Sequence, residues 1–169
     1  MTYPRYTHAD RIKFARDVLR DQRLTQRSFR RRGGSGREYV CAISSFGPDI
    51  HNHLSCPSDF MPAWLAARIP GWFDNLVPSQ IYAFQERLIN LAERWIVLNG
   101  GDWAALKQRV DRHARTGPQA LDIIEAYLDG TDLPGEAELK EIRKQKGPAI
   151  AAEIPIDIPM VTYKEPAAA

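Results

Sequence analysis

The chain of 169 residues is poor in cysteine and has no long apolar segment. Its two cysteines, Cys41 and Cys56, are typical of a protein from a reducing compartment rather than of a small disulfide-stabilised domain. No apolar run approaches the roughly 18 residues of a membrane-spanning helix. Residues 1–6 also lack the apolar core of a secretory signal. We therefore expect a cytoplasmic protein with no membrane partner.

Charge is unevenly distributed along the chain, although the net charge is only +2. Residues 1–38 carry eleven Lys and Arg against four acidic residues, which gives a net charge of +7. The remaining residues carry twelve basic and seventeen acidic side chains, a net charge of −5. With 44 % hydrophobic and 26 % charged residues the composition is otherwise that of a globular protein. The sequence thus predicts a globular protein with a basic N-terminal segment.

Apolar residues recur at helical spacing in several segments, which predicts a mainly α-helical fold with at most a minor β element. The clearest stripe lies within residues 78–98 and consists of Ile81, Phe84, Leu88, Leu91 and Trp95. The expected helices are residues 7–21, 62–68, 78–98, 102–115, 117–129 and 136–146. Residues 39–46 form a short buried element that is either helix or strand.

Local signals predict where these helices begin and end. Thr7 and Asp10 have the spacing of a capping box, so a helix should start there. The helix beginning at Pro62 should stop before Pro70, because proline disrupts a helix interior. Asn99 and the two glycines after it should end one helix, and Asp102 should cap the next.

Composition divides the chain into an N-terminal helix and basic connector at 1–38, a helical core at 39–146 and an extended C-terminal arm at 147–169. Four prolines in the arm forbid a long helix, and its isoleucines alternate with other residues as in a strand. Such an apolar arm should dock on a protein partner or on a second copy of the chain. The side chains predicted to make this contact are Ile154, Ile156, Ile158 and Met160.

Arginine makes up seven of the eighteen residues from 20 to 37. These residues are Arg20, Arg23, Arg27, Arg30, Arg31, Arg32 and Arg37. Guanidinium groups bind phosphates bidentately, so the segment, part of which could form a strand or hairpin, is a candidate contact for nucleic acid or an acidic partner. Alternatively, the acidic remainder of the chain neutralises these charges internally. The glycines that follow are not a phosphate-binding loop, because the Lys-Ser/Thr ending is absent.

Two cysteines and two histidines lie within sixteen residues, at Cys41, His51, His53 and Cys56. Thiolate and imidazole are zinc ligands, so this stretch is a candidate metal site, although it lacks a tight Cys-x2-Cys pair. Cys41 is also a candidate nucleophile with a histidine as its base. A disulfide between the cysteines is a third reading. In the fourth, Cys41 is a small buried hydrophobic residue and the histidines lie in a surface loop.

The chain resembles an uncharacterised class of small helical proteins from bacteria and their phages in three short sequence segments. These are CAISSF at 41–46, WFDN at 72–75 and FQERLINLAERW at 84–95. The resemblance covers about residues 38–96. Ser44 and Ser45 stand where that class has small apolar residues or glycine. The resemblance implies no activity, and it indicates only a phage or mobile-element setting.

These observations favour a non-enzymatic binding or assembly module, such as an accessory or structural component of a phage particle or nucleoprotein complex. One alternative is a metalloprotein or thiol enzyme built on the cysteines and histidines, with zinc as its only expected cofactor. A second alternative is a nucleic-acid-binding protein that uses the arginine-rich segment. The interior of a phage particle is then the alternative location to the cytoplasm.

Overall fold

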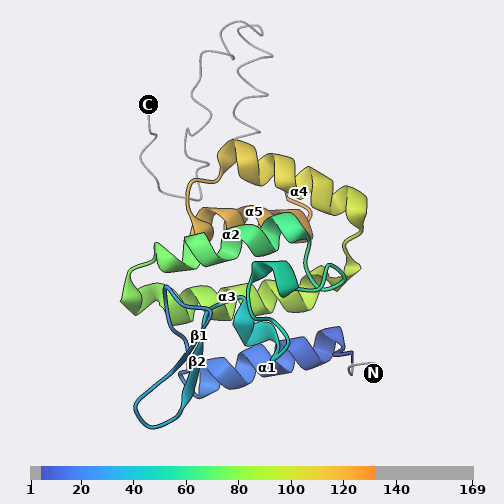
Figure 1. Cartoon of the computed structure of the whole chain (residues 1–169). Helices are drawn as coiled ribbons and strands as arrows, with labels where there is room; N and C mark the ends of the chain where they lie inside the picture. The colour runs from blue at the N-terminus through green and yellow to red at the C-terminus, as the bar shows by residue number, and fades with distance from the viewer. Residues whose placement is uncertain (1–4, 132–169) are drawn as a thin grey trace, which may run out of the picture. The chain divides into compact units, whose positions relative to one another are not determined.

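The computed structural model describes residues 5–131 and confirms the mainly helical fold (Figure 1). This part of the chain contains five α-helices and a two-stranded antiparallel sheet. In chain order the elements are α1 (His8–Arg20), β1 (Arg30–Arg32), β2 (Glu38–Val40), α2 (Ala63–Asp74), α3 (Ile81–Arg94), α4 (Gly100–His113) and α5 (Gly117–Leu128). Single 3-10 turns lie at Ser44–Phe46, His53–Ser55, Pro78–Gln80 and Trp95–Val97.

The chain divides into two compact units, Met1–Val97 and Leu98–Ala169. The first contains α1 to α3 and the β1–β2 hairpin, and the described part of the second contains α4 and α5. The three parts predicted in the sequence analysis were defined by amino-acid composition, whereas these units are defined by contacts between residues. The two divisions describe different properties, so the units do not test that prediction.

Helix α1 begins at the predicted capping box. The Thr7 hydroxyl accepts a hydrogen bond from the Asp10 backbone N–H at 3.0 Å, and the Asp10 carboxylate accepts one from the Thr7 N–H at 2.9 Å. Both bonds satisfy backbone donors that a helix start leaves without partners. The helix ends at Arg20 with Asp21 as its C-terminal cap, as the sequence predicts.

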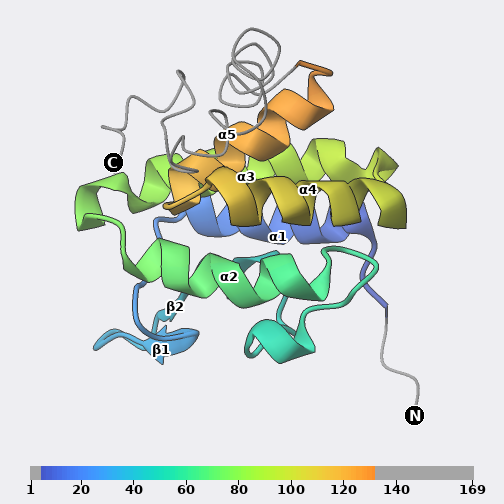
Figure 2. The ribbon, with the colours of Figure 1, turned by 90° about the horizontal axis from the view of Figure 1, so that it is seen from above.

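The core of the first unit forms where α1 packs on α3, and the two helices lie side by side in both views (Figures 1 and 2). The predicted apolar stripe of α3 is confirmed, since all five of its residues are buried. From α1, Ile12, Ala15 and Val18 face this core. The indole N–H of Trp95 donates to the Phe60 carbonyl at 3.0 Å, which fixes the end of the stripe against the 56–61 loop.

Helix α2 is longer than predicted, because it continues through Pro70 to Asp74. Proline cannot donate the usual backbone hydrogen bond. However, Leu65, Ile69 and Phe73 recur at steps of four and are all buried, so the apolar face continues beyond the proline. The prediction of a helix stop before Pro70 was wrong, because burial of this face outweighs the local signal.

The buried element predicted at residues 39–46 is both strand and turn. It begins in β2 and ends in the 3-10 turn Ser44–Phe46, and residues 40–47 are all buried. The Gln85 side chain of α3 donates to Ser45 Oγ at 2.7 Å and to the Ala42 carbonyl at 3.2 Å. These two bonds hold the segment against α3 and satisfy the Ser45 hydroxyl and the Ala42 carbonyl, whereas Ser44 Oγ and Gln85 Oε1 are buried without a hydrogen-bond partner among the described residues.

In the second unit α4 starts earlier than predicted. Asn99 is its N-terminal cap, accepting from the backbone N–H groups of Gly101 and Asp102 at 2.9 and 3.1 Å. Asp102 is the third residue of the helix rather than its cap, and it accepts from the Tyr127 hydroxyl of α5 at 2.6 Å. The expected cap at Asp102 was therefore wrong by three residues, because Asn99 and Asp102 form a capping box of their own.

Several predictions fall outside residues 5–131. These are the helix at 136–146 and the arm at 147–169 with Ile154, Ile156, Ile158 and Met160. Within the described part of the chain, no helix has the length and apolar character needed to cross a membrane.

Candidate functional site

The last part of the arginine-rich segment, residues 30–37, lies in the β1–β2 hairpin, which projects from the helices in both views (Figures 1 and 2). Arg30 is paired with Val40, Arg31 with Tyr39 and Arg32 with Glu38. Gly33 closes the turn by donating to the Arg37 carbonyl at 2.8 Å. At the tip, Gly36 has a φ of +81°, a conformation that strongly favours glycine.

Arg30 fixes the base of the hairpin and is only 22 % exposed. One amino group of its guanidinium donates to Glu38 Oε1 at 2.8 Å. The other donates to the carbonyls of Gly47 at 2.7 Å and Ile50 at 3.1 Å. A planar guanidinium is suited to such a fork of acceptors, so Arg30 acts as a structural clamp between the hairpin and residues 44–50.

Arg31 and Arg37 lie over the ring of Tyr39. Their guanidinium carbons are 5.0 and 5.9 Å from the ring centroid, within the range of cation–π attraction. Arg31 also donates to the Thr25 hydroxyl at 3.3 Å, and a β-carbon on Gly33 would lie 2.9 Å from the edge of the Tyr39 ring. The aromatic ring thus holds two cationic groups in place.

Arg31, Arg32 and Arg37 together form what we call the hairpin surface. All three are exposed. Within residues 5–131 none of them forms an ion pair with a carboxylate within 4.0 Å. Arg32 donates only to the Gly36 carbonyl at 3.2 Å, and Arg37 donates to the Asp21 carbonyl. The charges of Arg31 and Arg32 are therefore left to face solvent, whereas that of Arg37 is partly offset by the nearby Asp21 carboxylate, whose pKa it helps to lower.

The remaining predicted arginines are held within the first unit. Arg20 pairs with Asp17 and Asp21 at 3.1 Å, and these hydrogen bonds lower the pKa of the Asp21 carboxyl. Arg23 lies 3.8 Å from Asp21. The backbone N–H of Arg27 donates to Asp74 at 2.7 Å. This last bond does not involve the guanidinium, so the ion pairs of Arg20 and Arg23 are formed with acids close to the segment, Asp17 and Asp21, rather than with the acidic remainder of the chain.

The Cys/His stretch is divided between core and surface. Cys41 is 3 % exposed, and burial raises the pKa of its thiol. Burial raises the pKa of Cys56 to about 12. Both cysteines are free thiols, which contradicts the alternative of a disulfide between them. A raised pKa is the opposite of what a thiol nucleophile requires, because only the thiolate attacks.

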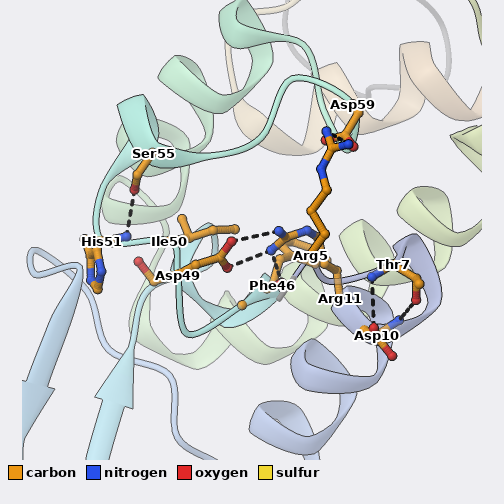
Figure 3. A network of polar contacts seen from close by, with 12 residues as sticks. Arg5, Thr7, Asp10, Arg11, Phe46, Asp49, Ile50, His51, Ser55 and Asp59 are labelled. Atoms are coloured by element: carbon orange, nitrogen blue, oxygen red, sulfur yellow. Dashed lines mark hydrogen bonds and ion pairs between the residues drawn. The ribbon is translucent and has the colours of Figure 1, made fainter. Parts of the chain in front are cut away.

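The two histidines lie in a loop whose geometry is set by its neighbours. Asn52 Oδ1 accepts from the Leu54 and Ser55 N–H groups at 2.8 and 3.2 Å and so caps the turn that contains His53. The His51 backbone donates to Ser55 Oγ at 2.8 Å (Figure 3). Among the residues that the structure describes, no group of three or more His, Cys, Asp or Glu is placed to hold a metal ion.

The structure therefore does not assemble Cys41, His51, His53 and Cys56 as a metal centre. The burial of Cys41 among Ile43 and Phe46 is that of a small hydrophobic core residue, and His51 is exposed in the loop. Of the four sequence readings, core packing with a surface loop agrees best with these positions.

Sequence reasoning missed an ion pair between a buried arginine and a partly exposed aspartate. The guanidinium of Arg11 donates to both carboxylate oxygens of Asp49, at 2.9 and 2.8 Å, and to the Phe46 carbonyl at 3.2 Å (Figure 3). It also lies 5.5 and 5.9 Å from the ring centroids of Tyr6 and Phe60. Because the partners are 38 residues apart, no local pattern could have revealed the pair.

Two small surface pockets lie among the described residues of the first unit. One of about 190 Å³ is lined by Phe14, Asp17, Val18, Arg23, Arg30, Glu38, Val40, Ser44, Ser45, Gly47 and Pro48. The other, of about 100 Å³, is lined by Arg27, Ser28, Phe29, Cys41, Pro70 and Asp74. Both are smaller than the roughly 300–1,000 Å³ of typical small-molecule sites.

Comparison with known proteins adds no assignment: no family model, no curated protein and no solved structure matches this chain. The resemblance to small helical bacterial and phage proteins therefore stays a prediction.

Proposed function

We propose that this protein is a non-enzymatic binding module that docks a negatively charged partner on the hairpin surface. The observation that carries the proposal is the exposure of Arg31, Arg32 and Arg37 on a hairpin whose base is clamped by Arg30. Among the described residues none of these three guanidinium groups lies within 4.0 Å of a carboxylate, and only Arg37 acts on one, Asp21, from further away.

The charge of the surrounding segment supports the same conclusion. Residues 20–40 contain seven arginines and two acidic residues, a net charge of +5. A local excess of one sign attracts oppositely charged partners over a distance of about one Debye length, roughly 8–10 Å. The segment would therefore steer an acidic partner toward the hairpin before contact.

The hairpin surface is also ordered before binding. Tyr39 holds Arg31 and Arg37 by cation–π contacts, and Arg32 is bonded to the turn. Immobilising a flexible side chain at an interface costs about 0.5–1.5 kcal/mol. Side chains that are already restrained lose less entropy on binding, which favours a docking role for this surface.

The alternative of a thiol enzyme is less well supported. Both thiols have raised pKa values, and the pocket that Cys41 lines has a volume of about 100 Å³. We retain the assembly role, in a phage particle or a nucleoprotein complex, as part of the proposal. The arm at 147–169 would then supply a second, apolar contact.

The proposal is tested by retention on immobilised heparin, a sulfated polyanion. The test variant carries Arg31→Gln, Arg32→Gln and Arg37→Gln. The control carries Arg5→Gln, Lys13→Gln and Lys107→Gln, which removes the same charge from exposed positions outside the hairpin.

We expect the hairpin variant to elute at clearly lower salt than the wild type and the control to elute close to the wild type. Equal shifts for both variants would mean that retention reflects net charge alone, which would overturn the proposal. Circular dichroism of both variants checks that the helices remain folded.

A further inference from the structure

The tip of the hairpin has a composition that suits a nucleic acid better than a protein. Residues 31–37 read RRGGSGR and contain no apolar side chain. The exposed large hydrophobic residues of the described chain are Leu54, Val77, Ile96 and Val97, all outside the hairpin. The centre of a protein–protein interface is rich in aromatic residues and methionine as well as arginine, and the tip has only arginine, whereas surfaces that bind nucleic acids are polar and positively charged.

The spacing of the guanidinium groups is compatible with a phosphate backbone. Since Arg31 and Arg37 lie 5.0 and 5.9 Å from the same ring centroid, their guanidinium carbons are at most roughly 11 Å apart. One strand of a duplex carries a charge about every 3.4 Å along its axis, so two nearby phosphates fall within this span. Each guanidinium can bind a phosphate through two parallel hydrogen bonds.

The turn leaves room for close approach of a backbone. A β-carbon added at Gly34 or Gly36 would meet no atom within 4 Å, so both positions face open space. Phosphate oxygens can therefore reach the main chain of the tip without displacing a side chain. Backbone N–H groups in turns commonly contribute to anion binding, but those of Gly33 and Gly36 already donate within this turn, so the arginine side chains would make the main contact.

The aromatic rings in and beside the hairpin, Tyr39 and Phe29, are not free to stack on bases. The Tyr39 ring is half-buried and is covered by Arg31 and Arg37, and Phe29 lines the pocket of about 100 Å³. Binding of single strands relies on aromatic faces on which bases can stack. The hairpin surface offers cationic groups rather than such a stacking platform.

Taking the proposed docking function as its basis, we propose that the partner is a nucleic acid duplex, bound through its phosphate backbone without readout of base sequence. Three arginines that each neutralise one phosphate give a slope of about −3 for log K against log salt. A slope of −3 corresponds to a loss of about 60-fold in affinity between about 50 and about 200 mM salt.

The test is fluorescence anisotropy of the full chain with two labelled DNA duplexes of unrelated sequence, one matched single strand and labelled poly-glutamate. We expect equal affinity for both duplexes, weaker binding of the single strand and of poly-glutamate, and a salt slope of about −3. Each single change of Arg31, Arg32 or Arg37 to Gln should reduce the slope by about 1. The control variant with changes at Arg5, Lys13 and Lys107 should keep it.

The outcomes separate this inference from the function on which it rests. Preference for poly-glutamate would identify an acidic protein as the partner, which overturns the duplex proposal and leaves the docking function intact. A tenfold preference for one duplex sequence, or for the single strand, would show that bases are contacted and would also overturn it. If none of the four ligands binds, both proposals fail.

Discussion

Replacing Asp49 by Asn removes the negative charge that faces the buried guanidinium of Arg11. The Arg11 side chain is 5 % exposed, so water cannot take over the role of the carboxylate at that position. The Asp49 side chain is 40 % exposed, which allows part of the lost interaction to be replaced by solvent. The change should therefore destabilise the fold, but less than the loss of a partner from a fully buried pair.

The expected magnitude follows from these two exposures. Breaking a fully buried ion pair by removing one partner costs about 3–5 kcal/mol, and exposed pairs contribute about 0–1 kcal/mol. With one partner buried and the other partly solvated, we expect Asp49→Asn to cost about 2–3 kcal/mol. For a chain of this size that is a fall of about 10 °C in the melting temperature.

The assay is urea denaturation of the wild type, Asp49→Asn, Arg11→Met and the double variant. Arg11→Met should cost less than Asp49→Asn, because it removes the buried charge and keeps an apolar chain near Tyr6 and Phe60. The double variant should be more stable than additivity predicts, by about 1.5 kcal/mol.

The pH dependence gives an independent check. The hydrogen bonds from Arg11 are the main reason that the pKa of Asp49 lies below its usual value. The folded state thus binds a proton less readily than the unfolded state, so the pair stabilises the protein fully above about pH 5 and loses this contribution as the pH falls. The deficit of Asp49→Asn should be largest at neutral pH and shrink below about pH 4.

A deficit below about 0.5 kcal/mol at neutral pH, or a coupling energy of that size, would refute the reasoning. Either result would mean that the Arg11 guanidinium is solvated or repacked when Asp49 loses its charge. Asp59→Asn provides a matched control, since Asp59 pairs with the highly exposed Arg5 at 3.5 Å and should change stability little.

Three other perturbations follow from the same structure. Gly47→Ala would place a methyl group against Arg11 Nη1 and Asp49 Oδ1, so we expect a loss of about 1–3 kcal/mol in urea denaturation, and an unchanged midpoint would contradict this. At pH 8 a thiol with a pKa of about 12 is ionised in about one molecule in ten thousand. Cys56 should therefore react with Ellman's reagent far more slowly than free cysteine does. A rate within about tenfold of that of free cysteine would be inconsistent with this pKa. Removing residues 147–169 should abolish association in analytical ultracentrifugation and leave the melting temperature nearly unchanged, whereas a truncated chain that unfolds would assign these residues to the fold itself.

Local signals in the sequence predicted the parts of the fold that depend on neighbours in the chain. The capping box at Thr7 and the apolar stripe of α3 both involve residues three or four apart, so their geometry is set within one turn of helix. The start of α4 could also have been predicted from a capping box. Asn99 and Asp102 have the spacing of Thr7 and Asp10, but the two glycines between them favoured a turn.

Other features depend on which segments meet in the folded protein. Helix α2 passes through Pro70 because its apolar face is covered, and the sequence does not reveal what covers it. Cys41, His51, His53 and Cys56 were predicted as a candidate metal site because they are close together in the sequence. The fold places Cys41 in the core and His51 in the loop. The Arg11–Asp49 pair joins segments 38 residues apart and could not be predicted.

The three consecutive arginines of β1 are identical in chemistry, and only the register of a three-residue strand distinguishes them. Pairing Arg30 with Val40 turns its side chain to the carbonyls of residues 44–50 and leaves its two neighbours exposed. If the pairing of β1 with β2 shifted by one residue, Arg30 would turn to the opposite face and Arg31 would take its place, since successive side chains alternate between faces. Mutational tolerance should follow the surroundings of each side chain rather than their shared chemistry: lysine should serve at Arg32, which is exposed and bonded only to the turn, and fail at Arg30, where a planar fork of donors is required.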